Sequence, residues 1–565
     1  MSEHELLAGL NEQQREAART LRGPVAIIAG AGTGKTRTIT HRIAYGVHTG
    51  VYDPDRVLAV SFTKKAAGEL QTRLRGLDVS GIRSQTFHSA ALAQLNYFWS
   101  QTVGGKPPQL VPRKLPNISQ AAESLRVRID PETARDIADE IEWRKVSMKT
   151  VDEYAELAHN RALPQSLSVE QIVDIMSRYE QLNSERRTID FEDVLILMSG
   201  MIEQEPKVGL EIRQQYRFFT VDEFQDVSPL QHTLLRGWLG ERDDVCVVGD
   251  ASQTIYSFTG ATSRYLTRFE HDHPNAQVFR LEHNYRSSEE ILAVANRLMR
   301  DQPGALQLVS KADPHPTAAP EKPLALWFQD ELAEAAGVAA AIAQQIHGGT
   351  QPSDIAVLAR TNAQLGAVET ALSAEGVSSQ TYGAVRFFER AEIKQAVMEI
   401  RAQSVVPDGR PPFQVVSDVA RGLGWCQTPP DSVAERDKWN ALQALVLLAE
   451  HHGDRPLRQL SEELLERQRA GDHPTVNAVT LTAIHSAKGL EWPVVYVIGA
   501  AEGLLPIHYA KAQADISEER RLAYVAFTRA QRLLRISGSG GGLRQEREPS
   551  RFLHEAGIKL RHVNS

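Results

Sequence analysis

The chain has 565 residues, too many for one hydrophobic core, so several domains are predicted. Hydrophobic residues make up 42% and charged residues 24%, as in ordinary globular proteins, and no apolar run is long enough to cross a membrane. The net charge of −8 is not that of a compact basic DNA-reading domain. Any contact with nucleic acid must therefore come from a local groove.

The cysteine content and the polar start of the chain indicate its compartment. Cys246 and Cys426 are the two cysteines, too few for a disulfide framework, a four-thiolate zinc site or an iron–sulfur cluster. Cys246 lies in the apolar run 245–248, which predicts a buried thiol. The first residues do not resemble a signal peptide. We expect a cytoplasmic protein.

Apolar, β-branched runs alternate with helical patterns along the chain, as they do in parallel α/β domains. In the first half, strands are predicted at 25–29, 57–62, 218–221 and 245–248. In the second half, they are predicted at 355–358, 479–484, 494–498 and 533–536. One sheet rarely takes so many interrupted strands, so two α/β domains are expected.

Two mainly helical segments interrupt these domains. The first covers 91–186 and is clearest at 171–182, where apolar residues fall on one helical face. The second covers 394–475, where Pro411-Pro412 and Pro429-Pro430 break helical pieces. The first α/β domain is thus predicted from 1–90 and 187–274, and the second from 275–393 and 476–565. A proline-rich loop is expected at 307–323, a short helix at 551–555, and no additional C-terminal domain.

Residues 25–36 read VAIIAGAGTGKT, an apolar strand that enters a glycine-rich loop and then a helix. Glycines let such a loop curl until its N–H groups surround a triphosphate, and the helix N-terminus faces the phosphates. Lys35 would reach the β- and γ-phosphates and Thr36 would bind Mg²⁺. An ordinary loop is the alternative. The candidate nucleotide-binding residues are Ala29, where the strict pattern has glycine, Gly30, Ala31, Gly32, Thr33, Gly34, Lys35, Thr36 and Arg37.

A second apolar strand ends in the acid pair Asp222 and Glu223. Asp222 is placed to hold Mg²⁺ through water, and Glu223 to polarise the water that attacks the γ-phosphate. An acidic strand end is common by itself, but two halves of one phosphate site on two apolar strands are much less common. The sequence therefore predicts binding and hydrolysis of ATP.

Three further motifs follow strand ends, where parallel sheets bind their ligands. Each of the segments 61–67, 85–89 and 248–261 combines aromatic and small polar residues, which can stack bases and bind phosphates. A single aromatic residue at a strand end is more often part of the core. Its repetition at three strand ends favours a nucleic-acid track.

Two arginines of the second half, Arg286 and Arg529, stand in motifs otherwise rich in small residues. A guanidinium brought to the γ-phosphate from another domain would neutralise transition-state charge and report whether ATP is present. A surface ion pair is the alternative for either motif alone.

Taken in order, about eight motifs between residues 10–14 and 550–553 resemble those of the superfamily 1 helicases of the UvrD/Rep/PcrA type. The resemblance implies an α/β fold with two RecA-like parallel-sheet domains of the P-loop NTPase class, each with a mainly helical insertion. It implies that ATP and Mg²⁺ bind between these domains.

The resemblance also implies individual roles. Gln14 would read the adenine, Tyr285 would stack on it and Glu491 would meet the ribose. Thr36 and Asp222 would hold the metal, Glu223 would be the general base, Gln253 would link hydrolysis to the DNA track, and Arg286 and Arg529 would be paired arginine fingers. The positions that match contacts to single-stranded DNA are Phe62, Thr86, Phe87, His88, Tyr256, Phe258 and Asn362.

This sequence departs from the family at Lys64, where Asn is usual, at Phe258, where many relatives have Trp, and at Thr259, where many have Arg. The second insertion, 394–475, is also shorter than the corresponding domain of better-known relatives, which grips duplex DNA and regulates unwinding.

The expected function is an ATP-dependent helicase that moves 3′ to 5′ on single-stranded or tailed duplex DNA, in DNA repair or replication restart, with repair or replication proteins as possible partners. One alternative is a translocase that displaces proteins but unwinds poorly. A nuclease-linked relative is disfavoured because no carboxylate-rich nuclease domain follows. An ATP-gated binding protein without turnover is disfavoured by Glu223, Gln253, Arg286 and Arg529.

Overall fold

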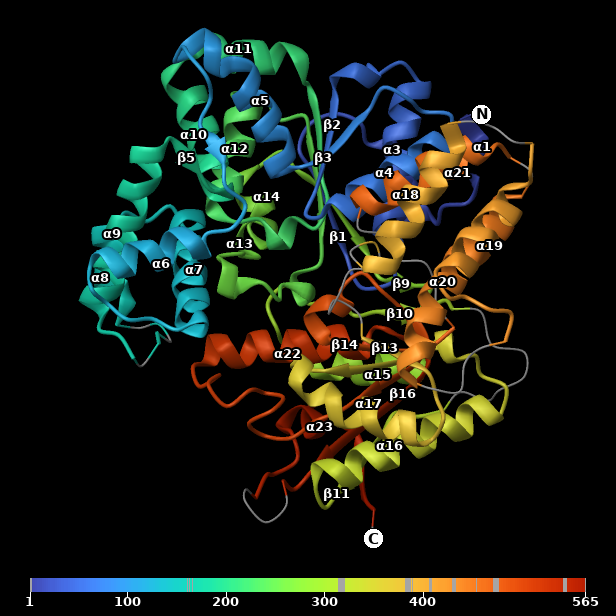
Figure 1. The fold of residues 1–565 in the computed structure, drawn as a ribbon. Coiled ribbons are helices and arrows are strands. Elements are labelled where there is room, and N and C mark those ends of the chain that lie inside the picture. The colour runs from blue at the N-terminus through green and yellow to red at the C-terminus, as the bar shows by residue number, and fades with distance from the viewer. Residues whose placement is uncertain are drawn as a thin grey trace. The chain divides into compact units, whose positions relative to one another are not determined.

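The computed structural model describes residues 3–159, 161, 163–164, 166–312, 321–381, 388, 390–405, 409–428, 433–453, 455–470, 477–541 and 546–563 (Figure 1). The predicted break at Pro429-Pro430 and the centre of the predicted proline-rich loop lie outside these residues. The chain divides into two compact units. Residues 1–30 and 34–281 form the first unit, and residues 31–33 and 282–565 form the second.

The first unit contains a parallel sheet with the strand order β3-β2-β6-β7-β1-β8. The strands are β1 (Val25–Ala29), β2 (Val57–Ser61), β3 (Arg83–Thr86), β6 (Phe218–Val221), β7 (Val245–Gly249) and β8 (Gln277–Leu281). The four strands predicted in this half are confirmed, whereas the edge strands β3 and β8 were not predicted. All six carboxyl ends lie on the same edge of the sheet because every neighbouring pair is parallel.

Both faces of this sheet are buried, as expected for parallel strands covered by helices. Each face of the sheet has its own hydrophobic cluster. Successive residues of β1 point into different clusters, with Ala26 in one and Val25 and Ile27 in the other. The same alternation places Cys246 beside Val248, which confirms the predicted buried thiol. The continuous apolar runs therefore reflect burial on two sides rather than a buried helix.

Two sets of helices cover these faces. One set is α1 (Glu3–Ala8), α2 (Glu12–Arg19), α3 (Lys35–His48) and α4 (Lys64–Arg75). The other is α5 (Phe87–Thr102), α10 (Phe191–Gln204), α11 (Pro206–Gln215), α12 (Pro229–Leu239), α13 (Arg264–Thr267) and α14 (Phe269–Asp272). Trp238 of α12 is fully buried under the second set of helices, stacked against Phe87 and Phe219.

A helical insertion with its own apolar core belongs to the first unit. Its helices are α6 (Leu115–Ser124), α7 (Pro131–Val146), α8 (Val151–Ala158) and α9 (Val169–Arg186). Helix α9 confirms the periodicity predicted at 171–182. The insertion is closed by the short parallel pair β4 (Gln109–Leu110) and β5 (Thr188–Ile189). Residue 91 falls inside α5, whose Leu95 and Phe98 pack under the sheet.

The second unit contains another parallel sheet, with the order β13-β14-β12-β15-β16-β11-β17. Its strands are β11 (Leu324–Phe328), β12 (Ile355–Ala359), β13 (Ser379–Thr381), β14 (Val479–Ala483), β15 (Trp492–Val497), β16 (Ala530–Ser539) and β17 (Lys559–His562). The four strands predicted here are also confirmed. A separate parallel pair joins β9 (His283–Asn284) and β10 (Val309–Ser310).

Helices α16 (Glu331–His347) and α17 (Leu365–Ala374) share an apolar cluster with this sheet. Helices α15 (Glu289–Leu298) and α22 (Gln513–Phe527) contact β16, and α23 (Arg551–Glu555) is the predicted short helix. Within 394–475, α18 (Ala391–Val405), α19 (Pro412–Gly422), α20 (Val433–His452) and α21 (Leu457–Ala470) pack around a core of their own.

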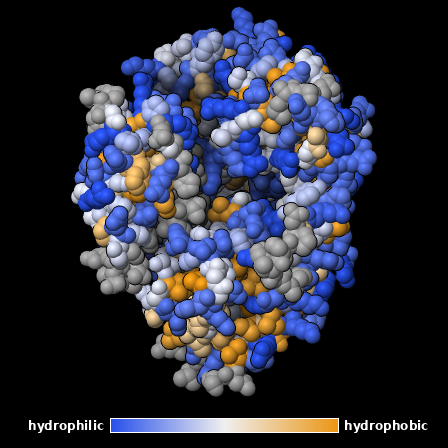
Figure 2. All heavy atoms as spheres, turned by 90° about the vertical axis from the view of Figure 1, so that its right-hand side faces the viewer, coloured by the Kyte–Doolittle hydropathy of each residue, from blue (hydrophilic) through white to orange (hydrophobic). Residues whose placement is uncertain are grey.

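The surface is consistent with these buried cores. The face drawn in Figure 2 is largely hydrophilic, with hydrophobic residues in small groups. Over the residues that the structure covers, no helix combines the length and apolar character needed to traverse a bilayer.

Candidate nucleotide and nucleic-acid site

The glycine-rich loop leaves β1 and ends at α3. Gly32 has φ 66° and Gly34 has φ 81°, left-handed conformations that glycine adopts without a Cβ clash. Ala29 is the last residue of β1, is fully buried and has no positive φ, so this position requires no glycine. Helix α3 starts at Lys35, so its first N–H groups and its positive end lie at the loop.

Lys35, at the start of α3, faces Glu223, which follows the carboxyl end of β6. Lys35 Nζ lies 3.6 Å from Glu223 Oε1, and both side chains are mostly shielded from solvent. Burial, together with the nearby charge of Glu223, raises the pKa of Asp222 above its ordinary value, although Lys35 opposes the rise. A cation would relieve this excess of buried negative charge. Asp222 and Thr36, at the start of α3, therefore fit a Mg²⁺ site.

The acid pair is held in a defined geometry. Glu223 has φ 52°, a left-handed conformation that a non-glycine residue adopts at a cost of about 1–3 kcal/mol. Its backbone N–H donates to Asp222 Oδ1 at 2.9 Å. Such strain persists where the surroundings fix it, and the next residues of the chain supply that constraint.

Gln225 supplies the constraint, and sequence reasoning missed it. This fully buried residue lies in the short 3₁₀ turn η2 (Phe224–Asp226). Its Nε2 donates to the Glu223 carboxylate and, at 3.2 Å, to Asp226 Oδ2, while its Oε1 accepts from Asp250 N at 2.9 Å. The sequence feature that could have identified Gln225 is its position two residues after the predicted general base.

The connection continues past β7. Gln253 Nε2 donates to Asp250 Oδ2 at 2.7 Å, within the turn η3 (Ala251–Gln253). Burial is the main cause of the raised pKa of Asp250. A continuous set of buried hydrogen bonds thus runs from Glu223 through Gln225 and Asp250 to Gln253, the residue predicted to link hydrolysis to the DNA track.

Aromatic rings follow this turn at the same edge of the sheet. Phe62, after β2, stacks on Tyr256 with a centroid distance of 5.4 Å and an interplanar angle of 20°. Tyr256 lies 6.2 Å from Phe258, which is 56% exposed in the turn η4 (Ser257–Thr259). These three predicted residues come together as a partly exposed aromatic surface that can stack bases.

The segment after β3 differs from this pattern. Thr86 caps α5 by accepting from Ser89 N at 3.1 Å. The Phe87 ring is 3% exposed and stacks on Trp238 at 5.8 Å, so it is part of the core and presents no face to a base. Burial, and secondarily Lys114, lowers the pKa of His88 to about 4. His88 is therefore a neutral residue at neutral pH.

In the second unit, Arg286 and Arg529 meet at Thr528. Arg286 Nη1 donates to the Thr528 carbonyl at 3.3 Å, and Arg529 Nη2 to its hydroxyl at 3.2 Å. Arg529 is 1% exposed and also donates to the carbonyls of Val525 and Leu490. Arg286 pairs with Glu491. The structure thus brings three predicted nucleotide-site residues together within one unit.

The remaining predicted residues have varied surroundings. Gln14 is buried and forms a capping box with Asn11 at the start of α2. Tyr285 is 46% exposed, and Asn362 is exposed in the turn η6 (Asn362–Gln364) after β12. Arg37 is exposed in the first turn of α3.

In the described parts of the chain, no three His, Cys, Asp or Glu side chains gather as a metal-binding group.

Comparison with known proteins finds matches over most of the chain. Residues 10–274 match the UvrD/REP helicase N-terminal domain, and residues 279–406 and 414–540 match the UvrD-like helicase C-terminal domain. The chain is 43% identical to the ATP-dependent DNA helicase UvrD2 of Mycobacterium tuberculosis over 97% of this chain and 82% of that protein.

A second relative is the ATP-dependent DNA helicase PcrA of Bacillus subtilis, 28% identical over 95% of this chain and 83% of that protein. The chain belongs to the UvrD/Rep helicase family. Its two parallel α/β sheets are the RecA-like P-loop folds of that family. The resemblance inferred from the motifs is confirmed.

Proposed function

We propose that the protein is an ATP-driven motor that moves 3′ to 5′ along single-stranded DNA and unwinds duplex DNA. The observation that carries this proposal is the buried chain of hydrogen bonds from Glu223 through Gln225 and Asp250 to Gln253. It joins the Lys35–Glu223 phosphate site to the turn that precedes Tyr256 and Phe258. Relatives named ATP-dependent DNA helicases support the same activity.

In the proposed reaction, Lys35 holds the γ-phosphate of ATP and neutralises the charge that develops there. Thr36 and Asp222 would hold Mg²⁺, which supplies positive charge to the phosphates. Glu223 accepts the proton of the attacking water, and its left-handed backbone and Gln225 fix the direction of its carboxylate. The N–H groups of the loop from Ala29 to Thr36 hold the remaining phosphate oxygens.

The second unit contributes Arg286 and Arg529 to the transition state. Because both guanidinium groups bind Thr528, one displacement of this unit moves them together. Gln14, Tyr285 and Glu491 recognise the nucleoside. A state that binds ATP better is favoured when ATP is present, and hydrolysis removes that preference, which gives an alternating motion.

DNA binds in this proposal to the aromatic surface of Phe62, Tyr256 and Phe258, with Thr86, His88 and Asn362 at its phosphates and bases. The Phe87 position contributes backbone only, because its ring is in the core. We propose the domain boundaries 1–90 with 187–274 and 275–393 with 476–565, each interrupted by an insertion. They need two adjustments, because α5 packs under the first sheet and β8 pairs with β1 in that sheet. Repair or replication restart in the cytoplasm is the proposed setting.

The decisive experiment combines turnover with unwinding. Phosphate release is measured with and without a single-stranded oligonucleotide, and strand separation is followed on duplexes with a 3′ or a 5′ tail. We expect stimulation by the oligonucleotide and unwinding of the 3′-tailed duplex. Turnover that is equally fast without DNA would overturn the proposal, and preference for the 5′ tail would overturn the direction.

A second candidate is a translocase that displaces bound proteins but separates strands poorly. The alignment with the Bacillus subtilis protein extends over 643 positions, more than the 565 residues of this chain, so that relative has segments that this chain lacks. A short second insertion would weaken the grip on duplex DNA. Displacement of streptavidin from a biotinylated strand without unwinding of the tailed duplex would favour this candidate.

A further inference from the structure

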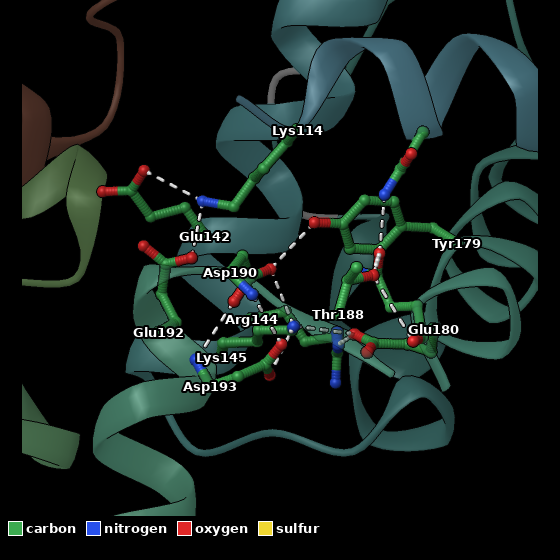
Figure 3. Close-up of polar contacts among 12 residues, drawn as sticks. Lys114, Glu142, Arg144, Lys145, Tyr179, Glu180, Thr188, Asp190, Glu192 and Asp193 are labelled. Carbon is green, nitrogen blue, oxygen red and sulfur yellow. Dashed lines mark hydrogen bonds and ion pairs between the residues drawn. The ribbon is translucent and has the colours of Figure 1, made fainter. Parts of the chain in front are cut away.

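A buried group of charges lies between the helical insertion and the start of α10 (Figure 3). At its centre is Lys145, in the last turn of α7, which is 3% exposed. Its Nζ lies 2.8 Å from Asp190 Oδ2, 2.7 Å from Asp193 Oδ1 and 3.3 Å from Glu180 Oε1. We call these four residues the Lys145 clasp. It ties together α7, α9 and α10.

The clasp is held firmly on the carboxylate side. Asp190 and Asp193 form the capping box of α10, and Tyr179 Oη donates to Asp190 Oδ2 at 2.9 Å. Burial alone would raise the pKa of Asp190, but Lys145 and then Lys114 lower it well below its usual range. Removing one partner from such a buried set leaves an uncompensated charge, so the contacts of the set are costly to break.

A residue next to the clasp touches the loop that bears Tyr256 and Phe258. Val146 follows Lys145 and ends α7. Gly260, directly after the turn of Phe258, has φ 86°, and a Cβ placed there would lie 2.5 Å from Val146 Cγ2. The loop therefore packs on the end of α7 without space for a side chain, and a shift of α7 must shift this loop.

Another neighbour of the clasp, Phe191, touches the segment after β3. Phe191 is the first residue of α10, between Asp190 and the rest of the helix. Its ring packs edge-on against His88, with a centroid distance of 6.1 Å and an angle of 89°. The Lys145 ammonium thus holds the end of α7 and the start of α10. These two helix ends support two segments that the proposed function assigns to DNA binding.

We propose that Lys145 is a positioning residue for single-stranded DNA. Its clasp sets the spacing between the loop 257–260, here the Phe258 loop, and the segment 86–89, here the His88 segment. This proposal rests on the proposed function, because it takes those segments as the DNA track. In this proposal the clasp acts through Val146 and the start of α10, and not through the Lys35–Glu223 site.

The test compares Lys145→Met with a matched control, Arg161→Met. Arg161 binds Glu140 by two hydrogen bonds of 2.6 Å in the same insertion. Both variants lose one largely buried cation, so their net charge is the same. Affinity for a labelled oligothymidylate is measured by fluorescence anisotropy at one salt concentration without nucleotide, and melting temperature is measured alongside.

We expect Lys145→Met to weaken single-strand binding about tenfold, whereas Arg161→Met lowers only the melting temperature. We also expect the DNA concentration for half-maximal ATPase stimulation to rise while the maximal rate is kept. In a double-mutant cycle, the effect of Phe258→Ala should shrink in the Lys145→Met background, a coupling that general destabilisation does not produce.

If Lys145→Met does not fold, Val146→Ala tests the role of the clasp in its place. This variant removes the contact with Gly260 and leaves every charge in place. We expect about threefold weaker binding for that variant. Unchanged affinity in folded Lys145→Met or Val146→Ala, with a wild type that binds DNA, would overturn the role of the clasp alone. A wild type that does not bind single-stranded DNA would overturn the proposed function as well.

Discussion

Replacing Gln225 by leucine tests the connection between the two parts of the candidate site. Leucine fills a similar volume but cannot donate to Glu223 or accept from Asp250 N. The buried Asp250 N–H loses its partner at a cost of about 1–3 kcal/mol, and the bond to a charged carboxylate is lost as well. We expect the free energy of unfolding to fall by about 2–4 kcal/mol, since such losses do not add fully.

The effect on turnover should be larger than the effect on stability suggests. Without Gln225, the Glu223 carboxylate is no longer held against its strained backbone. A misplaced general base costs about 10²-fold in kcat. The KM for ATP should change little, because Lys35 and the loop are left in place. Phosphate release with saturating single-stranded DNA gives kcat and KM, and urea unfolding gives the stability.

Gln94→Leu is the matched control. Gln94 is also buried and accepts from Trp238 Nε1 at 2.8 Å in the core beneath the sheet. It should lose about 1–3 kcal/mol of stability and keep its kcat. Gly249→Ala perturbs the Gln225 side chain independently, because a Cβ at position 249 would lie 2.4 Å from Gln225 Oε1. Wild-type kcat in Gln225→Leu, or equal losses in the Gln94 control, would refute the reasoning.

Three other predictions follow from single side chains. Lys35→Ala should lower ATP turnover by at least about 10²-fold, because the γ-phosphate loses its fixed charge; phosphate release measures it. Phe258→Ala should weaken oligonucleotide binding by about 1–3 kcal/mol in anisotropy titrations, and unchanged affinity would exclude a stacked base. Burial lowers the pKa of His232 to about 4, so the stability that this neutral ring contributes is complete above pH 6.5 and is lost as the pH falls toward 4. His232→Gln should flatten that part of a pH series of urea unfolding curves.

The central strands could be predicted because their burial is visible in the sequence. Strands β1, β6 and β7 are covered on both faces, so every residue of β6 is apolar or threonine. The edge strands could not be found in this way. Strand β3 reads RSQT, and only its last residue is buried, so it has neither an apolar run nor an alternation to detect. Its pairing with β2 follows from the sheet and not from its own composition.

The residue types of the candidate phosphate site could be read in the same way, because glycine, lysine and acidic residues have few other reasons to follow apolar strands in this order. The residue types could not predict which of the aromatic side chains are exposed to solvent. Phe62 and Phe87 both follow strand ends beside small polar residues, yet Phe62 is 38% exposed and Phe87 is 3% exposed. The difference arises from Trp238, which offers Phe87 a stacking partner in the core.

Long-range polar connections lie beyond sequence reasoning for a related reason. Lys145 binds carboxylates 45 and 48 residues further along the chain, and a lysine near a helix end is ordinarily a solvated residue that favours the helix dipole. Only the fold reveals that its ammonium is buried. Since burying an unpaired ammonium is far costlier than exposing it, α7 packs in this position only together with the carboxylates of α10. The Phe258 loop, which packs on the end of α7, then takes its position from charges that no motif contains.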